Sequence, residues 1–123
     1  MTLNTFLKIA AVAYFSFGAG LLLAPVPFMC VFGVGLDPGG TMLSRILGAA
    51  LIGFAMVFWR MQGDLQNSTV RELLLASFVY NLIDLPVVFE ATLSGTMGVM
   101  GWSAVLLHLL LAVGFGYFRF GRK

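Results

Sequence analysis

Four long apolar runs follow one another along the chain, and short polar or glycine- and proline-rich breaks separate them. The runs cover about residues 5–24, 41–61, 70–94 and 101–119. Each has the roughly 20 residues that an α-helix needs to cross a bilayer. The pattern predicts an all-α membrane protein, a four-transmembrane-helix bundle that forms one domain over residues 1–123.

The break after the first run contains two prolines, Pro25 and Pro27, which should stop or kink the helix. The apolar residues 28–34 that follow are too few to span a bilayer, so we expect an interfacial or re-entrant segment there. A loop rich in glycine comes next, and either Asp37 or Thr41 can cap the second spanning helix.

Small residues recur at short spacing in the first two runs and predict surfaces on which helices pack closely. They are Ser16, Gly18 and Gly20 in the first run, and Ser44, Gly48, Ala49 and Gly53 in the second.

A faint repeat relates the two halves of the chain at an offset of 59 residues. The matched positions are Pro27 and Pro86, Ser44 and Ser103, and the aromatic tripeptides that end at Arg60 and Arg119. Two repeated helical hairpins would produce this pattern, and so would chance similarity between apolar segments.

The composition supports a membrane location, because 60% of the 123 residues are hydrophobic and only 10% are charged, with a mean hydropathy of +1.00. Soluble domains have about 25% charged residues. The four spans use nearly the whole length and leave no room for a soluble domain. One cysteine, Cys30, can form neither an internal disulfide nor a thiolate metal cluster. The first run could serve as a signal peptide, but we expect a retained helix.

The basic residues predict the orientation of the helices. With both termini and the 62–70 loop on one side, that side holds six basic residues and the other side holds only Arg45. The six are Lys8, Arg60, Arg71, Arg119, Arg122 and Lys123. The positive-inside rule places this side in the cytoplasm. Because these residues mark membrane edges rather than a patch, we expect no binding of nucleic acid.

Polar residues interrupt the third apolar run, which carries Asn81, Asp84, Pro86 and Glu90. A carboxylate in the membrane costs several kcal/mol unless it is paired, neutral or facing water. The proline should also kink this helix and free a carbonyl group one turn earlier. These residues are therefore the first candidates for a buried polar site.

The rise of an α-helix, about 1.5 Å per residue, gives the depth of each polar residue. By that measure Arg45 and Glu90 both lie roughly 9–11 Å outward of their helix midpoints, and Asp84 and His108 lie within roughly 3 Å of mid-membrane. Asn81 is one turn from Asp84 on the same helix face. The depths permit two pairs, Arg45 with Glu90 and Asp84 with His108.

These groups have two interpretations. They can form a polar pocket in which Asp84 and His108 handle a proton, or they can satisfy one another and fix the helix packing. Glu90 can also reach the outer interface and leave Arg45 unpaired. The sequence has no cluster of cysteine and histidine and no glycine-rich phosphate loop, so we expect no metal, no cofactor and no catalytic motif.

Three short segments carry a resemblance to a known family. They are Leu-Ala-Pro at 23–25, Phe-Gly-Val at 32–34, and Ser-Arg-Ile-Leu-Gly-Ala-Ala at 44–50. In this layout the chain resembles small bacterial four-helix membrane proteins of the DoxX-like type. The resemblance implies a protein of the bacterial inner membrane, in a group whose members mostly lack an assigned activity. The first helix has no carboxylate, which speaks against small multidrug transporters of similar length.

Three functions fit these features. The first is a non-enzymatic accessory or assembly subunit, which packs in the bilayer against a larger membrane partner or against itself. The second is a binder or carrier of a small lipophilic molecule, with Asn81, Asp84 and His108 at its polar end. The third, least favoured, is a proton-transfer enzyme in which Asp84 and His108 act as acid and base.

Overall fold

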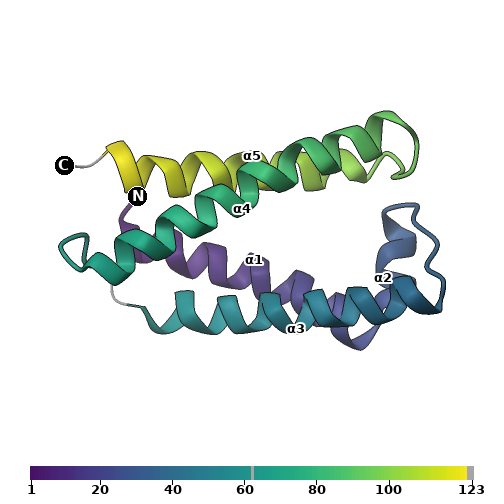
Figure 1. The fold of residues 1–123 in the computed structure, drawn as a ribbon, viewed down its shortest axis with the longest axis horizontal. Helices are drawn as coiled ribbons and strands as arrows, with labels where there is room; N and C mark the ends of the chain where they lie inside the picture. Colours follow the sequence, from purple (N-terminus) through teal and green to yellow (C-terminus); the bar gives the residue numbers. More distant parts are fainter. Residues whose placement is uncertain (62, 122–123) are drawn as a thin grey trace. The chain divides into compact units, whose positions relative to one another are not determined.

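Helices make up nearly all of the structure, a computed structural model that describes residues 1–61 and 63–121. In chain order they are α1 (Leu3–Leu23), α2 (Pro25–Val31), α3 (Pro38–Arg60), α4 (Ser68–Leu93), α5 (Gly101–Gly116) and the π-helical turn η1 (Tyr117–Gly121) (Figure 1). Four helices are long and apolar enough to cross a membrane, with α5 and η1 counted as one. The predicted all-α membrane fold is confirmed, and it is consistent with a four-helix bundle.

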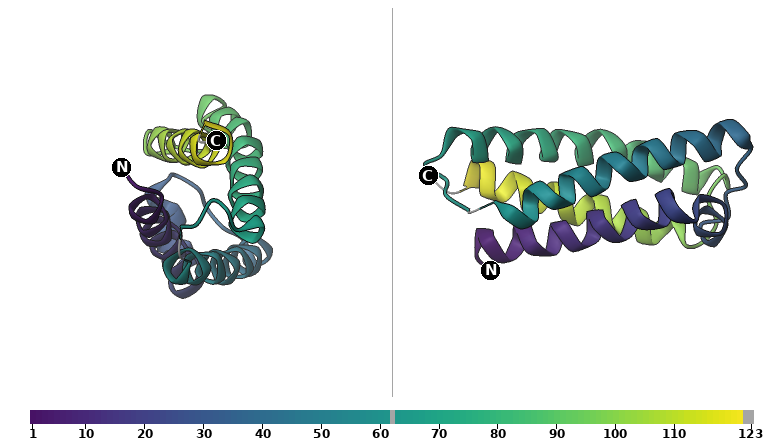
Figure 2. Two further views of the ribbon diagram at one scale, coloured as in Figure 1. Left: turned by 90° about the vertical axis from the view of Figure 1, so that its left-hand side faces the viewer. Right: turned by 90° about the horizontal axis from the view of Figure 1, so that it is seen from below.

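The chain divides into two compact units, and the boundary falls between residues 62 and 63. The first unit is a hairpin in which α1 packs against α3, with α2 between them in the chain. The second is a hairpin in which α4 packs against α5 and η1. Figure 2 shows α1 beside α3 along most of their lengths. That the two hairpins form one domain stays a prediction.

The first hairpin is closed by a glycine pair where α1 and α3 approach. A Cβ added at Gly18 would lie 2.8 Å from the carbonyl oxygen of Gly48, and one added at Gly48 would lie 2.7 Å from that of Gly18. Contact between glycine backbones is typical of closely packed membrane helices. Gly53, predicted for the same surface, faces open space instead.

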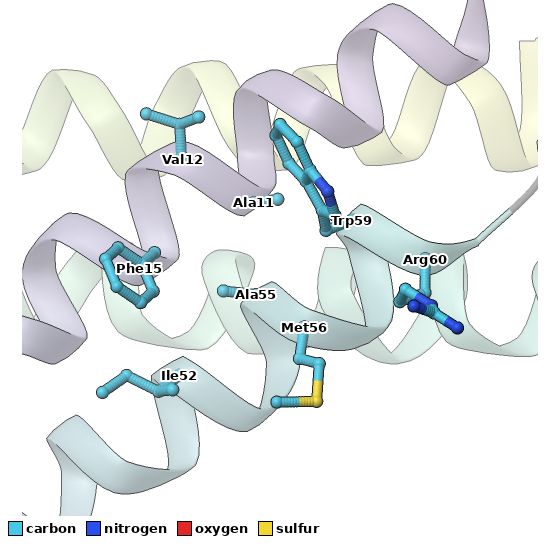
Figure 3. Close-up of a pocket in the computed structure, with 8 residues that line it drawn as sticks. All are labelled: Ala11, Val12, Phe15, Ile52, Ala55, Met56, Trp59 and Arg60. Carbon is cyan, nitrogen blue, oxygen red and sulfur yellow. The ribbon is translucent and has the colours of Figure 1, made fainter.

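Next to this seam, two buried alanines, Ala11 on α1 and Ala55 on α3, form the floor of an apolar groove. The groove has a volume of about 360 Å³ and is shown in Figure 3. Its walls and its ends come from larger side chains, which are Val12, Phe15, Ile52, Met56, Trp59 and Arg60.

The short helix α2 occupies the place of the predicted interfacial or re-entrant segment. It begins at Pro25 rather than after Pro27, because proline is well tolerated in the first turn of a helix. An aromatic cluster holds it against α1, with the ring of Phe28 5.5 Å from that of Phe17 and 5.6 Å from that of Phe32. Its position at the membrane interface stays a prediction.

The start of α3 lies three residues earlier than the apolar pattern indicated, at Pro38. Asp37 is the N-cap, and its Oδ1 accepts a hydrogen bond of 2.6 Å from the backbone N–H of Gly40. Of the two predicted caps, Asp37 therefore provides the side chain. Thr41 lies inside the helix, and its hydroxyl donates to the carbonyl of Asp37.

Replacing Asp37 by alanine is expected to lower the free energy of unfolding by about 1 kcal/mol, because the first turn of α3 loses its capping acceptor. Denaturation of the purified protein in mild detergent, followed by circular dichroism, measures the change. Asp37→Asn is the matched control, since the amide oxygen can cap equally well. An equal loss in both variants would show that the charge, and not the cap, matters.

In the second hairpin α4 continues through Pro86, so the proline does not end the helix. A small residue lies at a close contact between α4 and α5. A Cβ added at Gly116 of α5 would lie 3.0 Å from the ring of Phe78 on α4. At the end of the hairpin Arg119 Nη2 lies 3.7 Å from Glu72 Oε1. The faint repeat relates residues that are 59 positions apart, and at that offset the residues of α2 correspond to residues inside α4.

The two hairpins therefore differ at this point: the first has a separate short helix where the second has part of a continuous long one.

Candidate functional site

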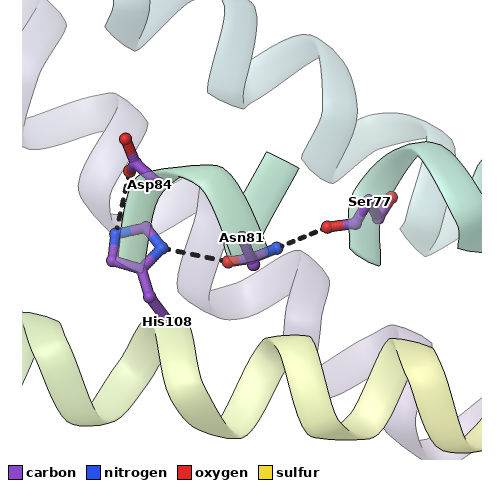
Figure 4. Close-up of polar contacts among 4 residues, drawn as sticks. All are labelled: Ser77, Asn81, Asp84 and His108. Atoms are coloured by element: carbon purple, nitrogen blue, oxygen red, sulfur yellow. Dashed lines mark hydrogen bonds and ion pairs between the residues drawn. The ribbon is translucent and has the colours of Figure 1, made fainter. Parts of the chain in front are cut away.

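The polar residues predicted in the third and fourth spans meet in the second hairpin, as Figure 4 shows. Asn81 and Asp84 lie one turn apart on α4, and His108 lies opposite them on α5. His108 Nδ1 is 3.0 Å from Asn81 Oδ1, and His108 Nε2 is 3.2 Å from Asp84 Oδ2. The amide group of Asn81 also donates to the carbonyl oxygen of Ser77 at 2.8 Å. We call these three residues, Asn81, Asp84 and His108, the polar triad.

The contacts of the triad restrict where its protons can lie. Asn81 uses its nitrogen to donate to Ser77, so its oxygen is the acceptor that faces His108. His108 Nδ1 must then carry a hydrogen. One further proton is shared between His108 Nε2 and the Asp84 carboxyl group, as an ion pair or as two neutral groups. Either arrangement has no net charge, which makes the triad tolerable inside a membrane.

Burial differs along the triad. Asn81 is fully buried, while the side chain of His108 is 16% exposed and that of Asp84 is 34% exposed. The ring of Tyr80 approaches His108 edge-on, with 6.2 Å between the ring centroids. The triad is therefore closed at Asn81 and open at the carboxyl group of Asp84.

The depth of the triad follows from the observed helix bounds. Asp84 lies three to four residues past the middle of α4, and His108 lies three residues before the middle of the span formed by α5 and η1. At about 1.5 Å per residue, both lie roughly 5 Å from the middle of their spans. Because the helices form a hairpin, these displacements point to the same membrane side. Both residues lie somewhat farther from the middle than the roughly 3 Å predicted, but their depths match. Their side chains are in contact.

The structure places Arg45 and Glu90 in different hairpins, and both side chains are exposed. The only carboxylate side chain of the first 62 residues is that of Asp37, which caps α3. Arg45 therefore has no acidic partner within its own hairpin. By the observed helix bounds, Arg45 lies about 6 Å and Glu90 about 14 Å outward of their helix midpoints, so the predicted match in depth does not hold for these two residues. Their pairing stays a prediction.

Two polar contacts were not predicted from the sequence. One is the ion pair between Arg119 and Glu72, which joins the end of α5 and η1 to the start of α4. The other is the hydrogen bond from the Lys8 side chain to the backbone carbonyl of Trp59. Each contact joins the first turns of one helix to the last turns of its neighbour. The two residues of each pair therefore lie at a similar depth, and this match could have indicated both contacts from the sequence. Arg122 and Lys123, which the charge pattern included, lie outside the described residues.

Within residues 1–61 and 63–121, histidine, cysteine and acidic side chains form no group of three or more that could hold a metal ion. Cys30 is a free, exposed thiol. The chemical groups of the triad are hydrogen-bond donors and acceptors and one partly exposed carboxyl group.

Comparison with protein-family models, curated proteins and solved structures finds no match. The resemblance to DoxX-like proteins thus stays a prediction, and the geometry alone carries the interpretation of function.

Proposed function

We propose that this chain is a non-enzymatic accessory or assembly subunit of the membrane, which packs against a larger membrane protein or against copies of itself. The loops between the helices are short, and about three quarters of the described chain lies in segments that can span the bilayer. Helix surfaces within the membrane are therefore the main surfaces that these residues offer.

Arg45 is the observation that carries this proposal. It lies four residues before the middle of α3, so it is about 6 Å from the middle of the span. An arginine at the centre of a lipid-facing helix costs about 2.5–3.5 kcal/mol on insertion scales, which is the upper bound for a residue about 6 Å from the centre. The side chain is exposed, and its own hairpin supplies no acid to pair with it. An acidic or polar group of another membrane chain would remove this cost.

The polar triad supports the same proposal. Its members bond to one another and to the backbone of α4 within a single hairpin, as expected for groups that fix helix packing. An acid–base pair for catalysis would need access to a substrate. His108 is mostly buried, and Asn81 is completely so.

Photo-crosslinking in membrane vesicles tests the proposal. A photoreactive amino acid replaces Ile46, an exposed residue beside Arg45, and the matched control replaces Val113, an exposed residue of α5. We expect Ile46 to give one protein product of defined mass. Arg45→Gln should lower its yield roughly five- to thirtyfold, since a polar contact between membrane helices contributes about 1–2 kcal/mol. Arg45→Lys, which keeps the charge, should retain most of the yield.

Two results would contradict the proposal. In the first, Ile46 forms products only with lipid, as Val113 is expected to do. In the second, Arg45→Gln leaves the protein product unchanged while Arg45→Gln and Glu90→Gln destabilise the isolated chain equally and without additivity. The charge would then be satisfied inside the chain.

A second candidate function is the binding of a small lipophilic molecule at the polar triad. The exposure of Asp84 favours it, because one end of the triad can reach a ligand without breaking the bond to His108. A carrier of this kind would lose ligand binding in Asp84→Asn, and its Ile46 would give no protein crosslink that depends on Arg45. The two candidates thus predict different outcomes for the same set of variants.

We further propose that the chain resides in a bacterial cytoplasmic membrane with both termini in the cytoplasm. The excess of lysine and arginine at one set of helix ends supports this orientation. The resemblance to DoxX-like proteins supports the bacterial membrane.

A further inference from the structure

The apolar groove of the first hairpin forms where two small residues lie between larger ones. Ala11 and Ala55 are nearly fully buried and face each other across α1 and α3. Larger side chains one residue further along each helix, Val12 on α1 and Met56 on α3, are more than half exposed and rise on both sides of the two alanines. The result is a groove along the helix pair whose lining is almost entirely hydrocarbon. Figure 3 shows the side chains that line it.

One end of this groove carries charge. Trp59 and Arg60 line it at the end of α3, and the Arg60 side chain is exposed. Lys8 lies one turn before Val12 on the same face of α1. Its Nζ donates to the carbonyl oxygen of Trp59 and lies 4.5 Å from the centre of the Trp59 ring. This contact holds the ammonium group beside the end of the groove.

Lys8 retains capacity for a ligand. An ammonium group has three donors, and the bond to Trp59 uses one of them. Arg60 has no ion-pair partner in the part of the chain that the structure describes. Trp59 and Arg60 thus line one end of the groove, and Lys8 lies against the Trp59 ring. Tryptophan and basic side chains of this kind mark the membrane interface.

We propose that this groove binds an anionic phospholipid, with its phosphate group between Lys8 and Arg60 and one acyl chain lying between α1 and α3. From Lys8 to Phe15 the helix rises about 10 Å, and the hydrocarbon half of a bilayer is about 15 Å thick. The groove therefore fits much of one acyl chain within a single leaflet. The basic end gives the site its preference for anionic over zwitterionic headgroups.

The dimensions fit a small occupant such as one acyl chain. The volume of about 360 Å³ is near the lower end of small-molecule sites, about 300–1,000 Å³. This inference does not depend on the proposed subunit function, which concerns a different part of α3.

Lipid binding to the purified, delipidated protein tests the proposal. Native mass spectrometry compares phosphatidylglycerol with phosphatidylcholine of the same acyl chains in a neutral detergent. We expect tighter binding of phosphatidylglycerol, and about fivefold weaker binding of it in Arg60→Gln and in Lys8→Gln. That factor corresponds to the loss of one basic residue at an anionic lipid surface. Binding of phosphatidylcholine should change little in either variant.

Two further variants, and the choice of glutamine at Lys8, make the test specific. Arg71→Gln removes an exposed cation that the charge pattern places at the same membrane edge, and we expect it to leave the lipid preference unchanged. Met56→Trp enlarges a side chain that is 65% exposed, so it should fill the groove and weaken both lipids without entering the core. Lys8→Gln keeps an N–H that can donate to Trp59, so it separates charge from packing.

The proposal would be overturned by equal binding of the two lipids, or by an equal effect of Arg71→Gln and Arg60→Gln. The first result would mean that the groove holds only acyl chains. The second would mean that the whole basic edge attracts anionic lipid without a site. Binding of glycerol phosphate without acyl chains, at the affinity of the intact lipid, would also overturn it.

Discussion

Gly48→Ala should unfold more readily than the parent protein, with a loss of about 1–3 kcal/mol in the free energy of unfolding. A methyl group at this position would lie 2.7 Å from the carbonyl oxygen of Gly18 and 2.7 Å from the backbone nitrogen of Leu22. Both neighbours are backbone atoms, which cannot turn away as a flexible side chain can. The two helices must separate, and contacts along the α1–α3 seam weaken together.

A matched control lies five residues further along the same helix. Gly53 has nothing within 4 Å of its Cβ position, so Gly53→Ala adds a methyl group without a clash. Alanine favours the helix over glycine by about 0.5–1 kcal/mol, and Gly53→Ala should therefore be neutral or stabilising. The opposite signs of the two glycine substitutions are the expected result.

Reversible unfolding in mixed detergent micelles, followed by circular dichroism, measures both glycine variants. The same sign and size of change at Gly48 and Gly53 would contradict the packing described for the first hairpin. Gly18→Ala offers an independent check, because its Cβ would lie 2.8 Å from the Gly48 carbonyl oxygen. It should lose as much stability as Gly48→Ala, and the two losses should not add, because both open one contact.

The lengths of the apolar runs predicted the spanning helices well, because a helix that crosses hydrocarbon must be long and nearly free of charge. They did not predict the first turn of α3, where an aspartate cap and a proline extend the helix outside the apolar run. They also did not show that α2 is a helix starting at Pro25. Hydropathy indicates which residues can lie in lipid, whereas the exact ends of a helix depend on local hydrogen bonds.

The direction of each side chain was harder to predict than its depth. Gly48 and Gly53 were predicted for the same surface, but only Gly48 meets α1. Residues five apart on a helix point about 140° away from each other, so both glycines cannot face one partner. Depth alone matched Asp84 to His108, and the structure joins them. It did not predict that Asn81 would orient the histidine ring from its other side. The groove was not predicted from the sequence, because alanines are common in apolar runs. Only the packing of α1 against α3 brings Ala11 and Ala55 together to form its floor.

His108→Leu is expected to cost about 2–4 kcal/mol of stability, because it removes the donor to Asn81 and the partner of Asp84 at once. Asp84→Leu should cost less, about 1–2 kcal/mol, since His108 keeps its bond to Asn81 and loses only one contact. The double variant should be no less stable than His108→Leu alone, because no unpaired carboxyl group is then left in the hairpin.

A double-mutant cycle on reversible unfolding in detergent measures this coupling, and Ser103→Ala is the control. Ser103 is an exposed polar residue of α5 whose hydroxyl bonds to its own helix, so its loss should change stability by less than about 0.5 kcal/mol. Additive losses for Asp84→Leu and His108→Leu would mean that the two groups do not stabilise the hairpin together. Single variants more stable than the parent would mean that the protein retains the triad at a cost in stability. A carboxyl group kept at such a cost, and exposed at one end of the triad, is what a ligand site in the membrane requires.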